Sequence, residues 1–349
     1  MKKNSPSHFI GIDLGDVKHA ICVLDAEGVV VEERSISNHR DSLRRLAKRY
    51  SDARVGLEVG MHSPWISRYL ADLGLEVLVA NARKLRAIYQ NTRKSDEADA
   101  KLLARLTRFD PELLYPIQHV SEEHQRDLLQ VKLRDNLVRQ RVDVISAIRF
   151  TLKSMGHRLP SPNTNCFAKR ARTLLADRPE ILALIEPSLQ VLDTMKEQIL
   201  ALDRAIERLC EEKYPETKRL RQIRGVGAIT ALCFVLTIGT PERFERPRDV
   251  GAYLGLVPKR DQSGRVDKEL RISKAGDKYL RRLLVGSAQY ILGPFGEDCE
   301  LRRQGLRLAE RGGRGAKKKA VVATARKLAV VMMTMWRDGS DYRPMSKAA

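Results

Sequence analysis

Residues 11–20 read GIDLGDVKHA and place a carboxylate, Asp13, inside what the sequence predicts to be a buried strand. Apolar residues precede it at 9–12, and a glycine-flanked turn leads to a second apolar run at 20–24. Burial of a carboxylate is costly unless the group is paired or binds a metal, and a strand offers no helix dipole to stabilise it. We therefore interpret Asp13 as a metal ligand.

Around this acid, residues 8–110 alternate short apolar runs with amphipathic stretches. Strands are predicted at 8–14, 19–25, 28–35, 54–59 and 75–80, and helices at 41–50, 64–73 and 96–108. Asp41 is expected to cap the first helix, and Ser63-Pro64 to begin the second. Three strands in series followed by alternating helices and strands predict an α/β domain with a mixed sheet, which we assign to residues 1–120.

Residues 121–215 are predicted to form a helical arm. Two glycine-poor stretches, 121–156 and about 185–213, are joined by a proline-containing linker at 157–166. The second stretch carries apolar residues at three- and four-residue steps, the spacing of a coiled-coil seam: Leu189, Leu192, Met195, Ile199, Leu202 and Ile206. The pattern fits an antiparallel helical pair or a dimerising arm, and it favours a dimer.

Residues 216–349 are expected to form a third, mainly helical domain. Its IRGVGAITAL segment at 223–232 has the pattern of a helix-hairpin-helix turn, in which Gly225 and Gly227 would turn backbone N–H groups towards a phosphate. An ordinary glycine-capped turn is the alternative. A polar loop is expected at 255–276, and the basic run at 301–320 is expected to be a solvated or mobile loop that contacts phosphates.

The charge of the chain points to a polyanionic partner. A net charge of +20, from 64 Lys and Arg against 44 Asp and Glu, favours DNA or RNA over mere solubility. The five cysteines are scattered and include no CxxC pair, which is typical of reduced thiols in a cytoplasmic protein. No segment approaches the ~20 apolar residues of a membrane span.

Three further acids are candidates for the site that Asp13 begins. Glu58 ends the short strand RVGLE, and Asp96 and Asp99 lie at i and i+3 in KSDEADAKLLARL, on one face of a helix start. Such oxygen ligands suit Mg²⁺, and two ions can flank a scissile phosphate. For Asp96 and Asp99 the alternative is that they are first-turn acids favoured by the helix dipole.

The segment GAYLGLVPKRDQSGRVDKELRISKAGDKYLRRLL, 251–284, holds two candidate serines, Ser263 and Ser273. A serine beside glycine in a loop is usually a turn residue, and Ser273 is expected to begin the following helix. All seven histidines lie at or before position 157, so no nearby histidine can act as a base for Ser263. Cationic residues surround this loop, and we expect the following to contact nucleic acid: Lys259, Arg260, Arg265 and Lys274, together with Lys317, Lys318 and Lys319 of the later basic run.

These motifs, in this order and spacing, resemble the DEDD-motif transposases of bacterial insertion sequences, which are bridge-RNA-guided recombinases related to a pilin-gene invertase. The resemblance extends over nearly the whole chain. It implies an RNase H-like, resolvase-like first domain whose acids fall on Asp13, Glu58, Asp96 and Asp99. It also implies, from the GLVP, Ser263 and SKAG layout, that Ser263 attacks a DNA phosphate and becomes linked to it.

The expected function is therefore that of a DNA recombinase that cuts and rejoins DNA through a serine link, with Mg²⁺ at the acids. The resemblance implies a structured guide RNA as partner, besides donor and target DNA. The coiled-coil seam favours a homodimer, and strand exchange at two sites implies a tetramer in the active complex. A structure-specific two-metal nuclease of the junction-resolvase type is the alternative enzyme, in which Ser263 is passive. A non-catalytic nucleic-acid-binding protein is the third possibility, and the four intact acids argue against it.

Overall fold

The computed structural model describes residues 6–85, 95–159, 164–263 and 266–345, and the chain divides into two compact units, Met1–Glu122 and Glu123–Ala349. The predicted division into three domains stays a prediction. No helix of the described residues is long and apolar enough to cross a membrane.

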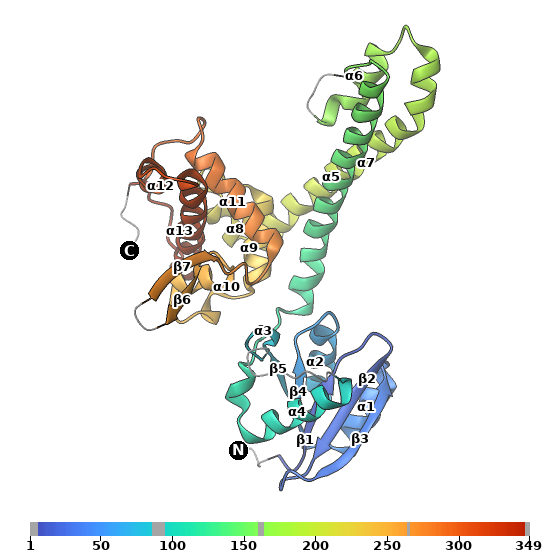
Figure 1. Cartoon of the computed structure of the whole chain (residues 1–349), viewed down its shortest axis with the longest axis vertical. Helices are drawn as coiled ribbons and strands as arrows, with labels where there is room; N and C mark the ends of the chain where they lie inside the picture. The colour runs from blue at the N-terminus through green and yellow to red at the C-terminus, as the bar shows by residue number, and fades with distance from the viewer. Residues whose placement is uncertain (1–5, 86–94, 160–163, 264–265, 346–349) are drawn as a thin grey trace. The chain divides into compact units, whose positions relative to one another are not determined.

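The first unit is built on a five-stranded sheet of order β3-β2-β1-β4-β5 (Figure 1). The strands are β1 (Phe9–Asp13), β2 (Lys18–Leu24), β3 (Val30–Ser37), β4 (Arg54–Glu58) and β5 (Glu76–Ala80). β2 pairs antiparallel with β1 and β3, whereas β4 runs parallel to β1 and β5. This mixed sheet confirms the α/β prediction and is consistent with an RNase H-like fold.

Helices cover both faces of this sheet. Residues of β1 and β2 pack on one face against α1 (Arg40–Arg49) and α2 (Ser63–Asp72). The alternate residues of the same strands pack on the other face against α4 (Asp96–Phe109), which Figure 1 shows lying across the sheet. The short α3 (Ala82–Leu85) follows β5. The period-two alternation of buried strands thus places every second residue of β1 beneath α4.

The helix starts agree only partly with the sequence analysis. α2 begins at Ser63 with Pro64 in its first turn, as predicted. The prediction that Asp41 caps α1 was wrong: the cap is His39, whose ring nitrogen accepts a hydrogen bond from the Asp41 backbone N–H at 3.3 Å. Asp41 instead lies in the first turn, where its carboxylate pairs with Arg44 at 2.9 Å.

The second unit begins with two long helices that pair antiparallel, α5 (Glu122–Ser154) and α7 (Pro179–Glu212). Arg134 of α5 donates to Asp203 of α7 at 2.8 Å, while Ile148, further along α5, packs in one cluster with Leu192, which lies earlier in α7. The seam residues Leu192 and Ile199 are therefore buried within the chain itself. The structure shows the first of the two predicted alternatives, the antiparallel helical pair. Because the seam is buried inside one chain, it gives no support to a dimer.

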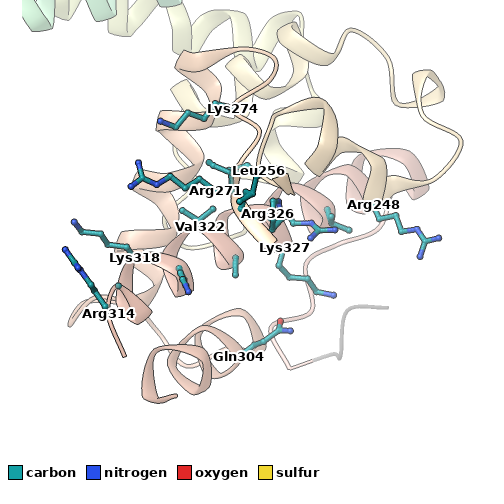
Figure 2. Close-up of a pocket in the computed structure, with 17 residues that line it drawn as sticks. Arg248, Leu256, Arg271, Lys274, Gln304, Arg314, Lys318, Val322, Arg326 and Lys327 are labelled. Carbon is teal, nitrogen blue, oxygen red and sulfur yellow. The ribbon is translucent and has the colours of Figure 1, made fainter. Parts of the chain in front are cut away.

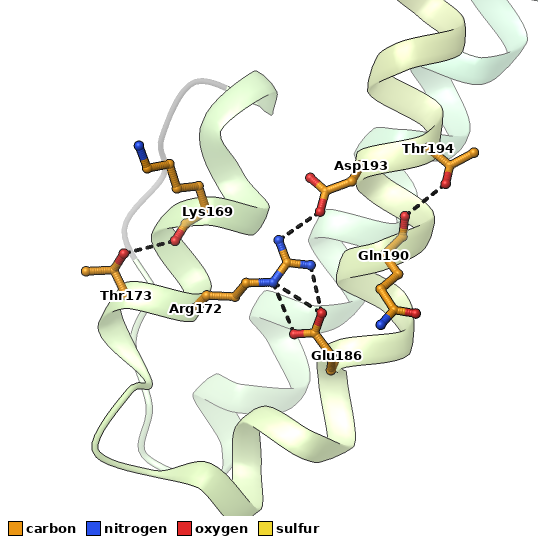
Figure 3. Close-up of polar contacts among 7 residues, drawn as sticks. All are labelled: Lys169, Arg172, Thr173, Glu186, Gln190, Asp193 and Thr194. Atoms are coloured by element: carbon orange, nitrogen blue, oxygen red, sulfur yellow. Dashed lines mark hydrogen bonds and ion pairs between the residues drawn. The ribbon is translucent and has the colours of Figure 1, made fainter.

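A third helix, α6 (Phe167–Leu174), closes the far end of the pair (Figure 3). Nε of its Arg172 donates to both carboxylate oxygens of Glu186, and Nη2 donates to one of them. Nη1 of Arg172 donates to the Asp193 carboxylate at 2.7 Å. Both carboxylates hold the guanidinium in its charged form, which raises the pKa of Arg172. This branched ion pair ties α6 to α7.

The remaining helices contribute to one hydrophobic core with α9 (Ala228–Ile238), an almost wholly buried apolar helix. They are α8 (Glu216–Leu220), α10 (Val250–Tyr253), α11 (Lys278–Leu292), α12 (Glu300–Glu310) and α13 (Ala316–Asp338). α9, α11 and α13 share one core cluster. A two-stranded antiparallel sheet, β6 (Pro258–Ser263) and β7 (Val266–Ile272), completes the unit.

Three predictions for this region were wrong. The expected polar loop at 255–276 is mainly the β6–β7 hairpin. The expected basic loop at 301–320 is mostly helix, because α12 ends at Glu310 and α13 begins at Ala316. Ser273 does not begin a helix: α11 starts at Lys278, and its cap is Asp277, whose carboxylate accepts from the Leu280 N–H at 2.8 Å.

A buried polar cluster joins α5 to the end of α7. Asp127 accepts hydrogen bonds from Tyr214, at 2.7 Å, and from Lys213, which also pairs with Glu123 at 2.8 Å. Burial pushes the pKa of Asp127 upwards, but the hydrogen bonds from Lys213 and Tyr214 outweigh burial and hold that pKa below its ordinary value. The carboxylate is therefore stabilising when it is ionised.

Asp127→Asn should lower the free energy of unfolding by about 1.5–3 kcal/mol at neutral pH, because hydrogen bonds to an ionised group are lost. A lowered native pKa means that this stability is present above the ordinary aspartate pKa and is lost as the pH falls through the native value. Urea unfolding at pH 7 and at progressively lower pH should show the two proteins converging. Glu123→Gln is the matched control, because Glu123 is exposed, and equal losses for both variants would contradict the role of Asp127.

Candidate functional site

Asp13 and Glu58 end two neighbouring parallel strands. The register pairs Gly11 with Gly56 and Ile12 with Leu57, so that the two acids follow as the next pair along β1 and β4. Adjacent strands lie ~5 Å apart, and alternation places both acids on the face that bears Gly11 and Gly56. Both acids are half-buried. The sheet therefore brings together two carboxylates that lie 45 residues apart in the sequence.

The same face is the one that α4 covers. A Cβ at Gly11 would overlap the backbone of Ala100 and Ala104 in α4, and a Cβ at Gly56 would overlap the Thr107 hydroxyl. The backbone of α4 thus rests directly on β1 at Gly11, and its Thr107 side chain rests on β4 at Gly56. These contacts fix the height and the direction of α4 relative to the two strand-end acids.

The first turn of α4 carries the other two acids. Ser95 caps the helix by accepting from the Ala98 N–H at 3.2 Å, and Asp96, Glu97 and Asp99 follow in that turn. Asp99 directly precedes Ala100, the residue that packs on Gly11. Asp99 is half-buried, whereas Asp96 is exposed. The helix start therefore carries its acids at the end of α4 that packs near Gly11.

The donor set of this site fits a hard divalent cation, because all four candidates are carboxylates. As the side chains are placed, however, no group of three or more His, Cys, Asp or Glu among the described residues could hold a metal ion. The strand register makes Asp13 and Glu58 neighbours, and the contact of Ala100 with Gly11 brings the first turn of α4 to the same face of the sheet. Metal binding itself stays a prediction.

Three histidines of the first unit were missed by the sequence analysis: His62 in the loop that follows β4, His19 in β2 and His119 between α4 and α5. His62 contacts the Asp16 carboxylate at 3.0 Å and accepts from the Trp65 indole N–H at 3.2 Å. His19 of β2 is fully buried, and burial lowers its pKa. Ser63 is hydrogen-bonded to His119 at 2.9 Å, but its hydroxyl also donates to the Gly60 carbonyl, so this pair helps to shape the turn before α2.

Ser263 is the last residue of β6, and its backbone pairs with Val266 at the end of the hairpin. It lies five residues along the strand from Pro258, which is about 16 Å at ~3.3 Å per residue. Arg260 on the same strand is held by Asp267 of β7, with its Nε donating at 2.8 Å. Arg265 lies outside the described residues.

The GLVP and SKAG segments meet at the base of this hairpin. The Ser273 N–H donates to the Val257 carbonyl at 2.9 Å, and the Lys274 N–H to the Gly255 carbonyl at 3.1 Å. Gly255 and Gly276 both adopt positive φ, at +67° and +70°. A Cβ at Gly255 would overlap the Ala275 backbone. The two segments thus form one closed crossing that anchors both strands of the hairpin.

The other predicted nucleic-acid contacts fall into three places. Gly225 and Gly227 lie in the turn between α8 and α9, where Gly225, at φ +92°, packs against Tyr290 and Gly227 is open. Lys274, Lys318 and Lys319 line one large groove. Lys259 and Lys317 are exposed and lie outside the described lining of that groove.

Two family models match this chain. A transposase model of the DEDD type, named for IS110, matches residues 10–157, which include the four acids. The model of the transposase IS116/IS110/IS902 family matches residues 217–295, which include the hairpin and Ser263. The chain belongs to the IS110 family of transposases. The predicted resemblance to DEDD transposases of insertion sequences is confirmed.

Curated relatives of this IS110-family chain agree along its length. It is 26% identical to the transposase for insertion sequence element IS1111A of Coxiella burnetii, over 96% of this chain and 91% of the relative. It is 27% identical to the transposase for IS1328 of Yersinia enterocolitica, over 80% and 82%. A probable family 20 transposase of Pseudomonas aeruginosa is 25% identical, over 96% and 98%.

Proposed function

We propose that this transposase cuts and rejoins DNA through a covalent link to Ser263, with a divalent metal held by the carboxylates of Asp13, Glu58, Asp96 and Asp99. The observation that carries the proposal is the register of β1 and β4, which makes Asp13 and Glu58 neighbours beneath the acidic first turn of α4. Asp13 and Glu58, 45 positions apart in the sequence, become neighbours in this way, and Asp99 directly precedes the residue of α4 that packs on Gly11.

The exchange at Ser263 conserves phosphate esters. The Oγ atom attacks the phosphorus, an Oγ–P bond forms, and the P–O bond to one sugar oxygen breaks. The serine proton goes to the released sugar oxygen. In the reverse step, a sugar hydroxyl of the joining strand attacks the phosphoserine, and the proton returns to Oγ. No outside energy source is needed, because one ester replaces another.

The chain's own residues have distinct roles in this scheme. Mg²⁺, when bound by the four acids, would stabilise negative charge and lower the cost of deprotonating a hydroxyl. Lys259, one residue from Arg260 on β6, would stabilise charge on the five-coordinate phosphate. Gly225 and Gly227 would present backbone N–H groups to a phosphate in a helix-hairpin-helix turn. The crossing of GLVP and SKAG would keep the hairpin rigid.

The partners follow from the family resemblance and from the charge of the chain. We propose donor and target DNA as substrates, a structured guide RNA, and a dimer that forms a tetramer for exchange at two sites. The net charge of +20 suits both nucleic acids.

The acids provide the experiment that tests this function. Asp13→Asn and Glu58→Gln should each reduce Mg²⁺-dependent recombination more than about 100-fold, beyond the 10–100-fold typical of residues that only orient a ligand. Mg²⁺ should raise the melting temperature of the wild-type protein but not that of either variant, because the ion stabilises only a state that binds it.

Glu97→Gln is the matched control, because Glu97 occupies the same turn of α4 and is exposed, but is not one of the four acids. It should recombine DNA at the wild-type rate. Wild-type rates for Asp13→Asn, or an equal loss for Glu97→Gln, would show that the metal assignment is wrong.

A further inference from the structure

We propose that a groove between the base of the β6–β7 hairpin and one face of α13 binds the sugar–phosphate backbone of a nucleic-acid strand, whatever its base sequence. The inference rests on the proposed function and deepens it, because it gives the recombination reaction a site that holds a strand without reading it.

The groove is large and open. Its volume is about 1360 Å³, above the ~300–1,000 Å³ of ordinary small-molecule pockets. The hairpin contributes Leu270 and Ile272, and α13 contributes Val322 and Val330, so the groove has an aliphatic floor. Figure 2 shows long cationic side chains around this floor. Such a size suits a length of polymer better than a single small ligand.

The charge of the groove is of one sign. Among the seventeen described residues that line it, eight are cationic and none is acidic: Arg248, Arg271, Lys274, Arg314, Lys318, Lys319, Arg326 and Lys327. Elsewhere in this unit, arginines are paired with carboxylates, as Arg303 is with Asp298 and Arg282 with Asp135. Within the described part of the chain, no ion pair joins Arg271, Lys318 or Arg326 to a carboxylate. Uncompensated cations around one groove attract an external polyanion.

One helical face supplies seven of the seventeen described lining residues. Residues 318, 319, 322, 323, 326, 327 and 330 recur at one-, three- and four-residue steps along α13, and Gly315 caps its start. Lys317 belongs to the same basic run, but it lies on another side of the helix and does not line the groove. Lys318 and Lys319 therefore line the groove, whereas the neighbouring Lys317 does not.

The composition of the lining favours phosphate contact over base reading. None of the described lining residues is aromatic, so the groove lacks the flat side chains on which single-stranded bases stack. Gln304 is its only described amide side chain, the kind that pairs with adenine, and because Arg and Lys can pair with guanine the test compares two unrelated base sequences. Contacts from Lys and Arg to phosphates carry no sequence information. Affinity here should therefore depend on salt and not on sequence.

The experiment compares Lys318→Gln with Lys317→Gln, which remove the same charge from adjacent residues of α13. Both substitutions would be made in a Ser263→Ala background, and binding would be measured without Mg²⁺. Fluorescence anisotropy would give the affinity for a labelled 20-nucleotide single-stranded DNA, for its duplex and for the corresponding RNA at salt concentrations from 50 to 300 mM. Lys318→Gln should reduce the log–log salt slope by roughly 0.7–0.9, the contribution of one phosphate contact. Lys317→Gln should leave it unchanged.

The triple variant Arg271→Gln, Lys318→Gln, Arg326→Gln should reduce the slope by roughly 2–3, equally for two unrelated base sequences. Equal effects of Lys317→Gln and Lys318→Gln, or an effect that depends on base sequence, would overturn the proposal. The proposal would also be overturned if the triple variant bound an acidic peptide more weakly than the parent protein does but bound nucleic acid equally well, because the groove would then be a protein-binding site. These binding measurements do not depend on DNA cleavage. If the groove binds nucleic acid as expected but the wild-type protein forms no DNA adduct, the proposed function is refuted and the groove proposal is not.

Discussion

Ser263→Ala should bind DNA and RNA like the wild-type protein but form no covalent DNA adduct, and recombination should fall by at least about 1,000-fold. The reason is that Ser263 carries the only hydroxyl in residues 258–272, and the proposed link is an ester of that hydroxyl. Loss of a nucleophile is among the largest single effects known in enzymes, up to ~10⁶ in kcat. The reaction would be trapped on a suicide DNA substrate and denatured, and the DNA-linked peptide would be mapped by mass spectrometry.

Ser273→Ala is the control for this experiment. Ser273 is held at the hairpin base by its backbone N–H, and alanine keeps that hydrogen bond to Val257. The adduct should therefore persist in Ser273→Ala. An adduct that maps to Ser273 would move the reactive residue by ten positions. Metal-dependent cutting with no adduct in the wild-type protein would favour the two-metal nuclease.

Gly11→Ala should destabilise the first unit by about 3 kcal/mol or more. The added methyl would overlap the backbone of Ala100 and Ala104, which cannot move aside as a flexible side chain can. Overpacking of this kind typically costs ~1–3 kcal/mol and more where the backbone must shift. α4 would be pushed away from β1, and the acids of its first turn would move with it.

Tryptophan fluorescence can follow this unit separately, because the two tryptophans of the chain, Trp65 and Trp336, lie in different units. In a Trp336→Phe background, urea unfolding would be read from Trp65 alone. Gly60→Ala is the control, since no atom lies within 4 Å of a Cβ there. Equal midpoints for Gly11→Ala and Gly60→Ala would contradict the direct contact between α4 and β1.

The first unit could be predicted well from the sequence because its signals are local. β1, β4 and α4 begin and end within one residue of the predicted boundaries, since apolar alternation and an acidic helix start define them. The seam of α7 was also recognised by its spacing. The spacing predicts that such a stripe is buried, but it does not predict which element covers the stripe. In this chain α5 and α6 cover it.

The second unit was harder because its signals depend on tertiary packing. β6, PKRDQS, has no apolar alternation, and it is defined by pairing with β7 and by the anchor at its base. The basic run 301–320 was expected to be a loop, but Gly305 in it packs α12 against Thr324 and Leu292, where a side chain would not fit without a shift of these neighbours. The groove combines cations from 248 to 327, and no local pattern joins these positions.

The close approach of α4 to Gly11 and Gly56 also bears on the history of the gene. Insertion sequences multiply by copying themselves, and copies that escape selection accumulate substitutions. A copy altered at Gly11 or Gly56 should encode a protein with a displaced α4 even where Asp13, Glu58, Asp96, Asp99 and Ser263 are intact. These two codons therefore help to separate genomic copies that can still move from those that have become fossils.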